Sequence, residues 1–298
     1  MRRFAESSHS HKNDTVRASR RLRNLGETKM FRLMKITILL AAATVAAIPF
    51  LAHAASSDWH ETEGMRIRLV TEQAPEGARE MRAALEIQLE PGWKTYWRDP
   101  GDSGVPPSIS FDHGSGIEHA EIEFPVPEHF DDGYSVWAGY GRPVSFAVTL
   151  ERDEARDPGT IEADVFLGVC QDICIPVQAR LSVEVHTGQS DPESAAIVEA
   201  AFAALPAKAG ELRAETVKTS PSHIVVEAKV PEGVEVTDLF IAGTDAYVLG
   251  SPKRAKGDGG TLFEVPVEVA PKDLHGDTAH YTLATSKGAV SGTLAIGN

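Results

Sequence analysis

Apolar and polar residues alternate through most of the chain after residue 55. Such alternation is typical of β-strands that bury one face. In the first half it covers residues 65–72, 82–90, 116–124, 143–151, 159–169 and 179–185. Turn sequences rich in Gly, Pro and Asp separate these runs. Six or more short strands with this spacing predict an antiparallel sandwich.

The hydrophobic period changes near residue 191. The segment "DPESAAIVEAAFAALPA" (191–207) repeats apolar residues at helical spacing, and Asp191-Pro192 is a suitable helix start. Strand-like alternation then returns at 223–230, 234–243, 261–269, 279–286 and 288–296. We therefore predict an all-β protein: a sandwich over 55–190, a linking helix over 191–209 and a second, smaller β domain over 210–298.

Residues 1–54 form an N-terminal extension and a predicted secretory signal. Arg32 and Lys35 precede the apolar run 36–51, and Ala52-His53-Ala54 matches a cleavage site. A retained membrane anchor is the alternative, but the run is short for a span and contains Pro49. We expect cleavage after Ala54 and export to the periplasm, an oxidising compartment.

The charge of the chain argues against nucleic acid as a partner. The formal net charge is −14, although ten of the 29 basic and only three of the 43 acidic residues lie before residue 55. The remainder is therefore more acidic still, and it repels polyanions. The sequence contains no nucleotide-binding loop and no Ser-His-Asp order, so neither a nucleotide enzyme nor a hydrolase is supported. The oligomeric state is not predicted.

Candidate chemistry is concentrated in Cys170 and Cys174, the only two cysteines. Cys170 ends a predicted strand, and a tight turn brings Cys174 within reach of a disulfide. A passive staple over so short a loop contributes only about 2 kcal/mol. Zinc needs four ligands and the histidines have no metal-binding spacing, whereas two thiolates are able to bind copper(I). We expect no cofactor and no metal site. The third interpretation of the two cysteines is a redox-active pair.

Three segments in order resemble a known family. The segment "ADVFLGVCQDICIPVQARLSV" resembles the cysteine hairpin of the N-terminal domain of DsbD thiol:disulfide interchange proteins. The segment "LEPGWKTYWRDPGDSGVPPSI" (89–109) is closest to the copper-sensitivity suppressor B type. The segment "HFDDGYSVWAGYGRPVSFAVTL" (129–150) resembles the part that carries the cap loop of the family.

The resemblance implies an immunoglobulin-like sandwich in the periplasm and a thiol:disulfide oxidoreductase activity. It implies that Cys174 forms the mixed disulfide with a partner and that Cys170 resolves it. Asp131, Asp132 and Tyr134 match the cap loop that shields the pair. The implied partners are thioredoxin-like periplasmic oxidoreductases and, because the sequence holds no membrane domain, a separate membrane electron-transfer protein.

A second class of function stays open. The chain is in that case a non-enzymatic binding or copper-handling module, and its disulfide only shapes a loop. The reduction potential distinguishes the two, since a passive structural disulfide lies below about −300 mV.

Overall fold

The structure is a computed structural model that describes most of the chain after residue 54. The described residues are 55–73, 77–101, 104–112, 114–131, 133, 136–153, 159–185, 191–255, 261–272 and 276–297. The predicted extension, signal and cleavage motif of residues 1–54 lie outside this range, so export stays a prediction. Within the described residues no helix is long and apolar enough to cross a membrane.

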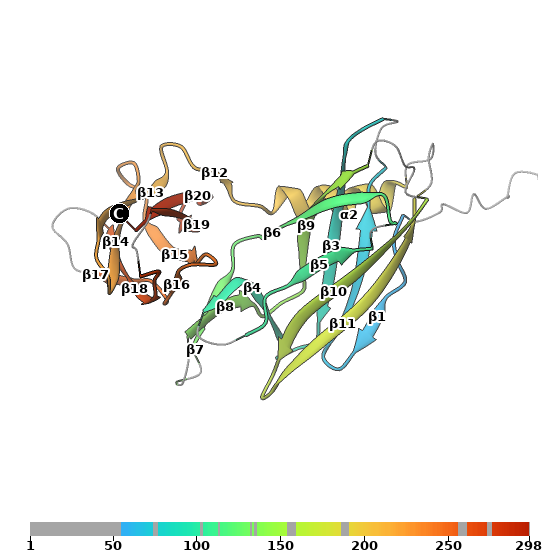
Figure 1. Ribbon diagram of the computed structural model, residues 1–298, viewed down its shortest axis with the longest axis horizontal. Helices are drawn as coiled ribbons and strands as arrows, with labels where there is room; N and C mark the ends of the chain where they lie inside the picture. The colour runs from blue at the N-terminus through green and yellow to red at the C-terminus, as the bar shows by residue number, and fades with distance from the viewer. Residues whose placement is uncertain are drawn as a thin grey trace, which may run out of the picture. The chain divides into compact units, whose positions relative to one another are not determined.

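Two antiparallel sheets form the first β domain (Figure 1). One sheet has the strand order β1 (His60–Thr62), β2 (Met65–Thr71), β3 (Glu80–Leu89), β9 (Val144–Arg152) and β6 (Ile117–Glu123). The other has the order β11 (Cys174–Glu184), β10 (Thr160–Cys170), β4 (Lys94–Gly101), β8 (Val136–Tyr140) and β7 (Glu128–Asp131). The short strand β5 (Ser108–Phe111) also pairs with β10.

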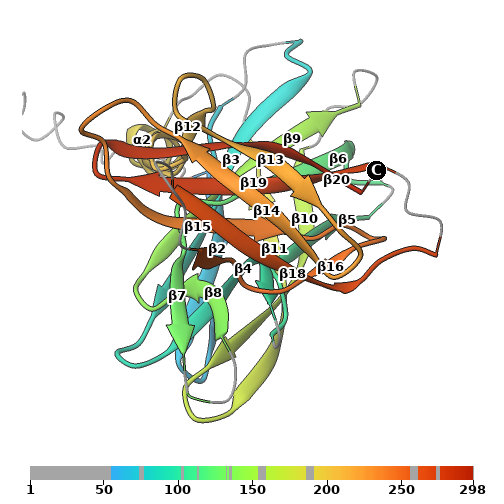
Figure 2. The same cartoon turned by 90° about the vertical axis from the view of Figure 1, so that its left-hand side faces the viewer.

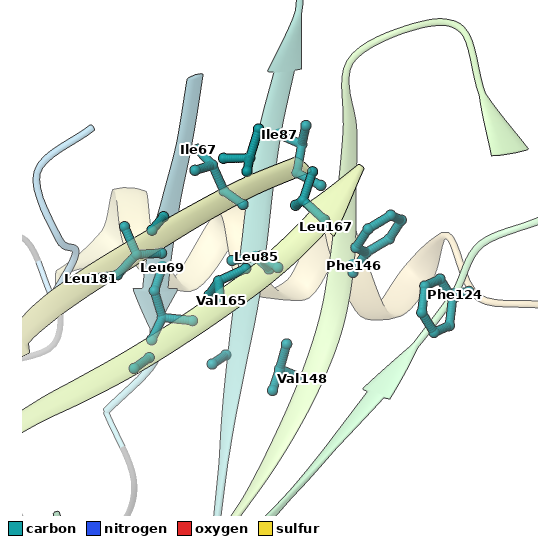
Figure 3. Packing of buried hydrophobic residues seen from close by; sticks show 14 of the residues in the cluster. Ile67, Leu69, Leu85, Ile87, Phe124, Phe146, Val148, Val165, Leu167 and Leu181 are labelled. Atoms are coloured by element: carbon teal, nitrogen blue, oxygen red, sulfur yellow. The ribbon is translucent and has the colours of Figure 1, made fainter. Parts of the chain in front are cut away.

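The facing sides of these sheets form the first core, because their strands alternate as the sequence predicts. In β10, Ile161, Ala163 and Val165 are buried, whereas Asp164 and Phe166 between them are exposed. Figure 3 shows Val165 and other residues of β10 and β11 packed against residues of β2, β3 and β9. A fully buried Leu or Ile side chain stabilises a fold by about 1.5–3 kcal/mol.

The linking helix α2 (Pro192–Ala203) follows the first domain. Asp191 caps it, accepting hydrogen bonds from the backbone N–H groups of Glu193 and Ser194. Its buried residues Val198 and Ala201 pack against β2, β3 and β9, on the outer face of the first sheet (Figure 1). The helix is shorter than the predicted span 191–209, and residues Ala207–Lys208 form a strand instead. It ends at Ala203 because the residue before a proline disfavours helical dihedrals and Pro206 follows closely.

The second β domain also consists of two sheets (Figure 2). One has the order β12 (Ala207–Lys208), β20 (Gly288–Ile296), β19 (Asp277–Thr285) and β15 (Val236–Ala242). The other has the order β13 (Arg213–Thr219), β14 (His223–Lys229), β18 (Thr261–Val269) and β16 (Val248–Leu249), and β17 (Lys253–Ala255) also pairs with β18. These strands enclose an apolar core of their own.

Strand β15 also contributes to the core of the first domain. Phe240 is 2% exposed and belongs, with Ala242, to the cluster of buried residues that fills the first sandwich. Its ring meets that of Trp97 edge-on, with centroids 6.0 Å apart. The two β domains therefore share a packed aromatic contact.

The all-β class, with a helix between a sandwich and a second β domain, is confirmed within the described residues. The hydrophobic pattern did not reveal the strands β1, β4, β5, β7, β8, β12, β13, β16 and β17. Three of these, β4, β7 and β8, carry most of the residues around the disulfide.

Candidate functional site: a disulfide at the tip of a hairpin

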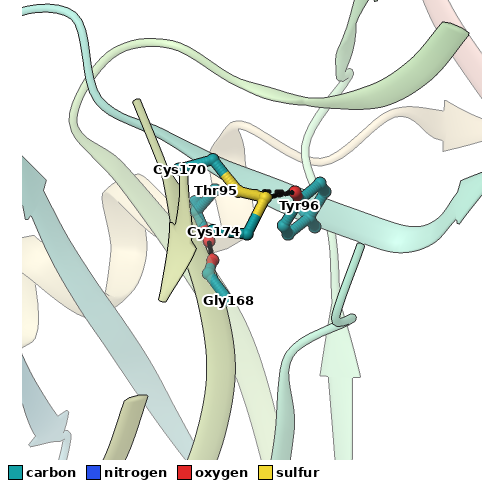
Figure 4. Close-up of a disulfide and its surroundings, with 5 residues drawn as sticks. All are labelled: Thr95, Tyr96, Gly168, Cys170 and Cys174. Atoms are coloured by element: carbon teal, nitrogen blue, oxygen red, sulfur yellow. Dashed lines mark hydrogen bonds between the residues drawn. A yellow bond between two sulfur atoms is a disulfide. The ribbon is translucent and has the colours of Figure 1, made fainter. Parts of the chain in front are cut away.

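Cys170 and Cys174 lie opposite each other where β10 turns into β11. The strands pair in register from Thr160↔Glu184 to Cys170↔Cys174, so the turn contains only residues 171–173. The two cysteines form a disulfide, with an S–S distance of 2.08 Å and a Cα–Cα distance of 4.1 Å (Figure 4). The long, regular hairpin thus fixes the disulfide at its tip.

The two cysteines differ in exposure. Cys170 is only 6% exposed, whereas Cys174 is exposed. The turn beside Cys174 is exposed as well, and the apolar side chain of Ile173 is 70% exposed. A thiolate arriving from solvent therefore meets Cys174 before Cys170, and it meets an apolar side chain beside it.

The hydroxyl group of Tyr96 lies against both sulfur atoms (Figure 4). Its oxygen is 2.6 Å from Sγ of Cys170 and 2.9 Å from Sγ of Cys174. When the disulfide opens, one sulfur becomes a thiolate, which accepts a hydrogen bond from this hydroxyl. Tyr96 is thus in position to stabilise the leaving thiolate.

Two further aromatic rings enclose the site. Trp137 of β8 lies on Tyr96, with ring centroids 5.0 Å apart, and Phe130 of β7 stacks on Trp137 at 4.4 Å. With Cys170 these side chains form an apolar cluster separate from the two domain cores. We call Tyr96, Trp137 and Phe130 the aromatic cover, since they lie on the side of the buried cysteine.

Strand β4 comes close to β10 just before Cys170. Thr95 is buried and donates a hydrogen bond of 2.9 Å from its hydroxyl to the carbonyl oxygen of Gly168 (Figure 4). A Cβ at Gly168 would lie only 3.0 Å from a ring carbon of Tyr96. Glycine two residues before Cys170 therefore leaves room for the tyrosine ring that reaches the sulfurs.

A cation lies at the same strand end. Lys94 pairs with Cys170 across β4 and β10. Its ammonium group lies 5.3 Å from the ring centroid of Phe130 and 5.8 Å from that of Trp137, close enough for cation–π attraction. Positive charge near a cysteine favours its thiolate form.

The predicted cap residues are only partly described. Asp131 ends β7, is exposed, and its Oδ1 accepts a hydrogen bond of 2.8 Å from the backbone N–H of Gly133. Asp132 and Tyr134 lie outside the described residues. The role of the three residues as a cap over the disulfide therefore stays a prediction.

Sequence reasoning did not select Tyr96 or Trp137 for the site, and it also missed Lys94, Thr95 and Phe130. The signal for Tyr96 was its place in a segment that resembles the family. Among the described residues no group of three or more His, Cys, Asp and Glu side chains is arranged to hold a metal ion.

The fold and the site define an antiparallel sandwich with a disulfide at the tip of a hairpin. Residues 69–185 match the family described as the N-terminal domain of the thiol:disulfide interchange protein DsbD. The first β domain therefore belongs to the DsbD N-terminal domain family, as the resemblance of its motifs implied.

A comparison with solved structures extends this likeness to the second domain. The N-terminal periplasmic domain of ScsB from Proteus mirabilis matches with a TM-score of 0.69 and 20% identity, covering 82% of this chain and 99% of that one. At this identity the match shows the fold, and it covers more of the chain than the first domain alone.

Two other solved structures resemble the chain only weakly. A conserved domain protein from Bacillus anthracis matches with a TM-score of 0.24 and 10% identity, covering 81% of this chain and 89% of that one. A pair of titin immunoglobulin domains matches with a TM-score of 0.17 and 12% identity, covering 74% of this chain and 88% of that one. A comparison with curated proteins gave no match.

Proposed function

We propose that the protein passes reducing equivalents through the Cys170–Cys174 pair, to or from thioredoxin-like oxidoreductases of the periplasm. The observation that carries the proposal is the asymmetry of the disulfide. An exposed sulfur is bonded to a buried one, and a tyrosine hydroxyl contacts both. Membership of the first domain in a thiol:disulfide interchange family supports it.

In the oxidised protein, the reaction begins with a thiolate of the partner. This thiolate attacks Sγ of Cys174, and the electron pair of the Cys170–Cys174 bond passes to Sγ of Cys170. Tyr96 donates a hydrogen bond to the new Cys170 thiolate, and Lys94 at the same strand end favours its negative charge. The second thiol of the partner then attacks the partner's sulfur in the mixed disulfide. The partner is left with a disulfide, and Cys174 leaves as a thiolate.

In the reduced protein, the same steps run in reverse. The Cys174 thiolate attacks a disulfide of the partner and forms the mixed disulfide, while one sulfur of the partner leaves as a thiolate. Cys170 then attacks Cys174, re-forms the Cys170–Cys174 bond and releases the reduced partner. Cys174 is thus the exchanging residue and Cys170 the resolving residue in both directions.

The pair needs a source of electrons and has to reach the periplasm. A separate membrane electron-transfer protein supplies reducing equivalents, through a thioredoxin-like module. The chain reaches the periplasm after cleavage behind Ala54, which sequencing the N-terminus of the exported protein tests. Asp131, Asp132 and Tyr134 are proposed to shield the pair until a partner docks.

The test is an equilibrium titration combined with a transfer assay. The oxidised protein is titrated in glutathione and dithiothreitol buffers, and its thiols are counted by alkylation. It is also mixed with a reduced thioredoxin-like periplasmic protein. We expect a potential above about −300 mV and transfer of two electrons. A potential below that value, with no transfer, would identify a structural disulfide and favour a binding module.

A further inference from the structure

We propose that the second β domain holds the aromatic cover closed over Cys170, through a contact between Asp238 and His129, and thereby confines thiol attack to Cys174. The inference rests on the proposed function, because confinement matters only for a disulfide that exchanges. It assigns a role to the second β domain, and it makes Asp238 and His129 positioning residues.

The argument begins on strand β7, where consecutive residues have different partners. Phe130 stacks on Trp137 within the aromatic cover. The ring of its neighbour His129 stacks on Phe240 of β15, with centroids 4.3 Å apart. Successive side chains of a strand point to opposite faces. Strand β7 therefore joins the aromatic cover on one side to the second β domain on the other.

A hydrogen bond fixes this junction. Nδ1 of His129 donates to Oδ2 of Asp238 at 2.9 Å. The other carboxylate oxygen of Asp238 accepts a bond of 2.8 Å from the backbone N–H of Leu239. The pairing of β15 with β19 shifts register between Val236 and Asp238, and such irregularities re-aim side chains out of a strand. The carboxylate is thus held toward β7.

A second contact holds the strand that carries Tyr96. Oδ2 of Asp99, in β4, accepts a hydrogen bond of 2.6 Å from the backbone N–H of Gly243, just after β15. A Cβ at Gly243 would lie 2.4 Å from the carbonyl oxygen of Tyr247, so the close turn here requires glycine. The segment 238–243 therefore binds both β4 and β7.

These two contacts enclose the remaining member of the aromatic cover. Strands β4 and β7 flank β8 in the sheet, and β8 carries Trp137. When both flanking strands are held, Trp137 has little freedom to move away from Tyr96 and Cys170. The second β domain thus keeps Cys170 buried while Cys174 stays exposed.

The experiment measures the reactivity of Cys170 alone. In a full-length Cys174→Ala variant, Cys170 is the only thiol, and its reaction with N-ethylmaleimide gives a rate constant. Adding Asp238→Ala removes the hydrogen bond to His129, and Asp99→Ala removes the second contact. Since one hydrogen bond shifts an equilibrium by roughly two- to tenfold, we expect each change to accelerate alkylation by about that factor.

The matched control is Glu215→Ala. It also removes a carboxylate of the second domain, one that pairs with Nε of Arg213 at 2.7 Å. We expect it to leave the alkylation rate unchanged. The inference would be overturned if Asp238→Ala and Asp99→Ala left the alkylation rate of Cys170 unchanged. It would also be overturned if Glu215→Ala accelerated alkylation as much as they do. Alkylation needs no redox partner, so a failure of the transfer assay leaves this test intact and counts only against the proposed function.

With both cysteines present, a second readout maps the position of attack. The oxidised protein reacts with glutathione, and mass spectrometry locates the mixed disulfide. We expect it on Cys174 in the parent protein and partly on Cys170 in Asp238→Ala. A mixed disulfide that stays entirely on Cys174 in that variant would contradict the proposed confinement.

Discussion

The hydroxyl of Tyr96 lies within hydrogen-bonding distance of both sulfur atoms of the disulfide. In the disulfide it meets weak acceptors, but in the transition state for exchange it meets developing negative charge. Hydrogen bonds to charged groups are stronger than neutral ones. The residue is therefore expected to act on the rate of exchange more than on stability.

We predict that Tyr96→Phe slows opening of the disulfide. Loss of a hydrogen bond to a charged group costs about 1.5 kcal/mol or more, which is roughly a tenfold lower rate. The measurement is the rate of reduction by dithiothreitol.

Tyr140→Phe is the control for this substitution. It removes a hydroxyl that donates to the carbonyl oxygen of Pro125 at 2.8 Å, away from the sulfurs. Burial raises the pKa of Tyr140 well above its ordinary value, so this hydroxyl stays protonated in the range of the assay. Reduction of Tyr96→Phe at the rate of this control would exclude a role for the hydroxyl.

Sequence reasoning found the cysteines because the chain contains only two. It did not select Tyr96, because aromatic residues fill cores as often as sites. Tyr96 and Trp97 are neighbours with 2% exposure each, yet Tyr96 reaches the disulfide and Trp97 fills the sandwich core. The pairing of β4 with β10 and β8 decides which of the two aromatic residues faces the disulfide and which faces the core.

At the scale of elements, the linking helix depends on its N-cap. The carboxylate of Asp191 accepts hydrogen bonds from the backbone N–H of Ser194 at 2.9 Å and from its hydroxyl at 2.6 Å. We predict that Asp191→Ala lowers the free energy of unfolding by about 1 kcal/mol. Asp191→Asn retains an acceptor and should cost less. Chemical denaturation at pH 7 measures both, and equal stability of all three proteins would contradict the capping role.

The same cap predicts a dependence on pH. Hydrogen bonds from Ser194 lower the pKa of Asp191 below its ordinary value. The stabilisation by its charge is therefore fully present above about pH 4 and is lost as the pH falls through the lower pKa of the folded state. The stability difference between the parent protein and Asp191→Asn should shrink below pH 4. A difference that stays constant down to pH 2 would contradict this linkage.

Regular strands were predictable and the site strands were not, for a physical reason. Strands such as β11 and β14 bury one face, so buried and more exposed residues alternate along them. In β4, the three consecutive residues Thr95, Tyr96 and Trp97 are buried, because one face meets the sandwich core and the other the disulfide. A strand buried on both faces loses the period by which it would be recognised.

At the scale of the whole molecule, Phe240 links the stability of the two domains. All four tryptophans, Trp59, Trp93, Trp97 and Trp137, belong to the first domain, so their fluorescence reports its unfolding. Phe240→Ala removes a buried ring of the second domain that packs on Trp97. We predict that it lowers the stability reported by tryptophan by about 3 kcal/mol.

Phe263→Ala is the comparison, since this buried ring lies in the core of the second domain. It should shift the tryptophan transition less than Phe240→Ala does. A tryptophan transition that Phe240→Ala leaves unchanged would show that the domains unfold independently.

The central claim is that Cys174 exchanges with a partner and Cys170 resolves the mixed disulfide. Single-cysteine variants of the full-length protein test it most directly, in a periplasmic extract that contains thioredoxin-like oxidoreductases. The products are separated on a non-reducing gel and identified by mass spectrometry. Cys170→Ala should accumulate long-lived mixed disulfides through the exposed Cys174, and Cys174→Ala should accumulate few. Trapping by Cys174→Ala alone, or by neither variant, would contradict the account.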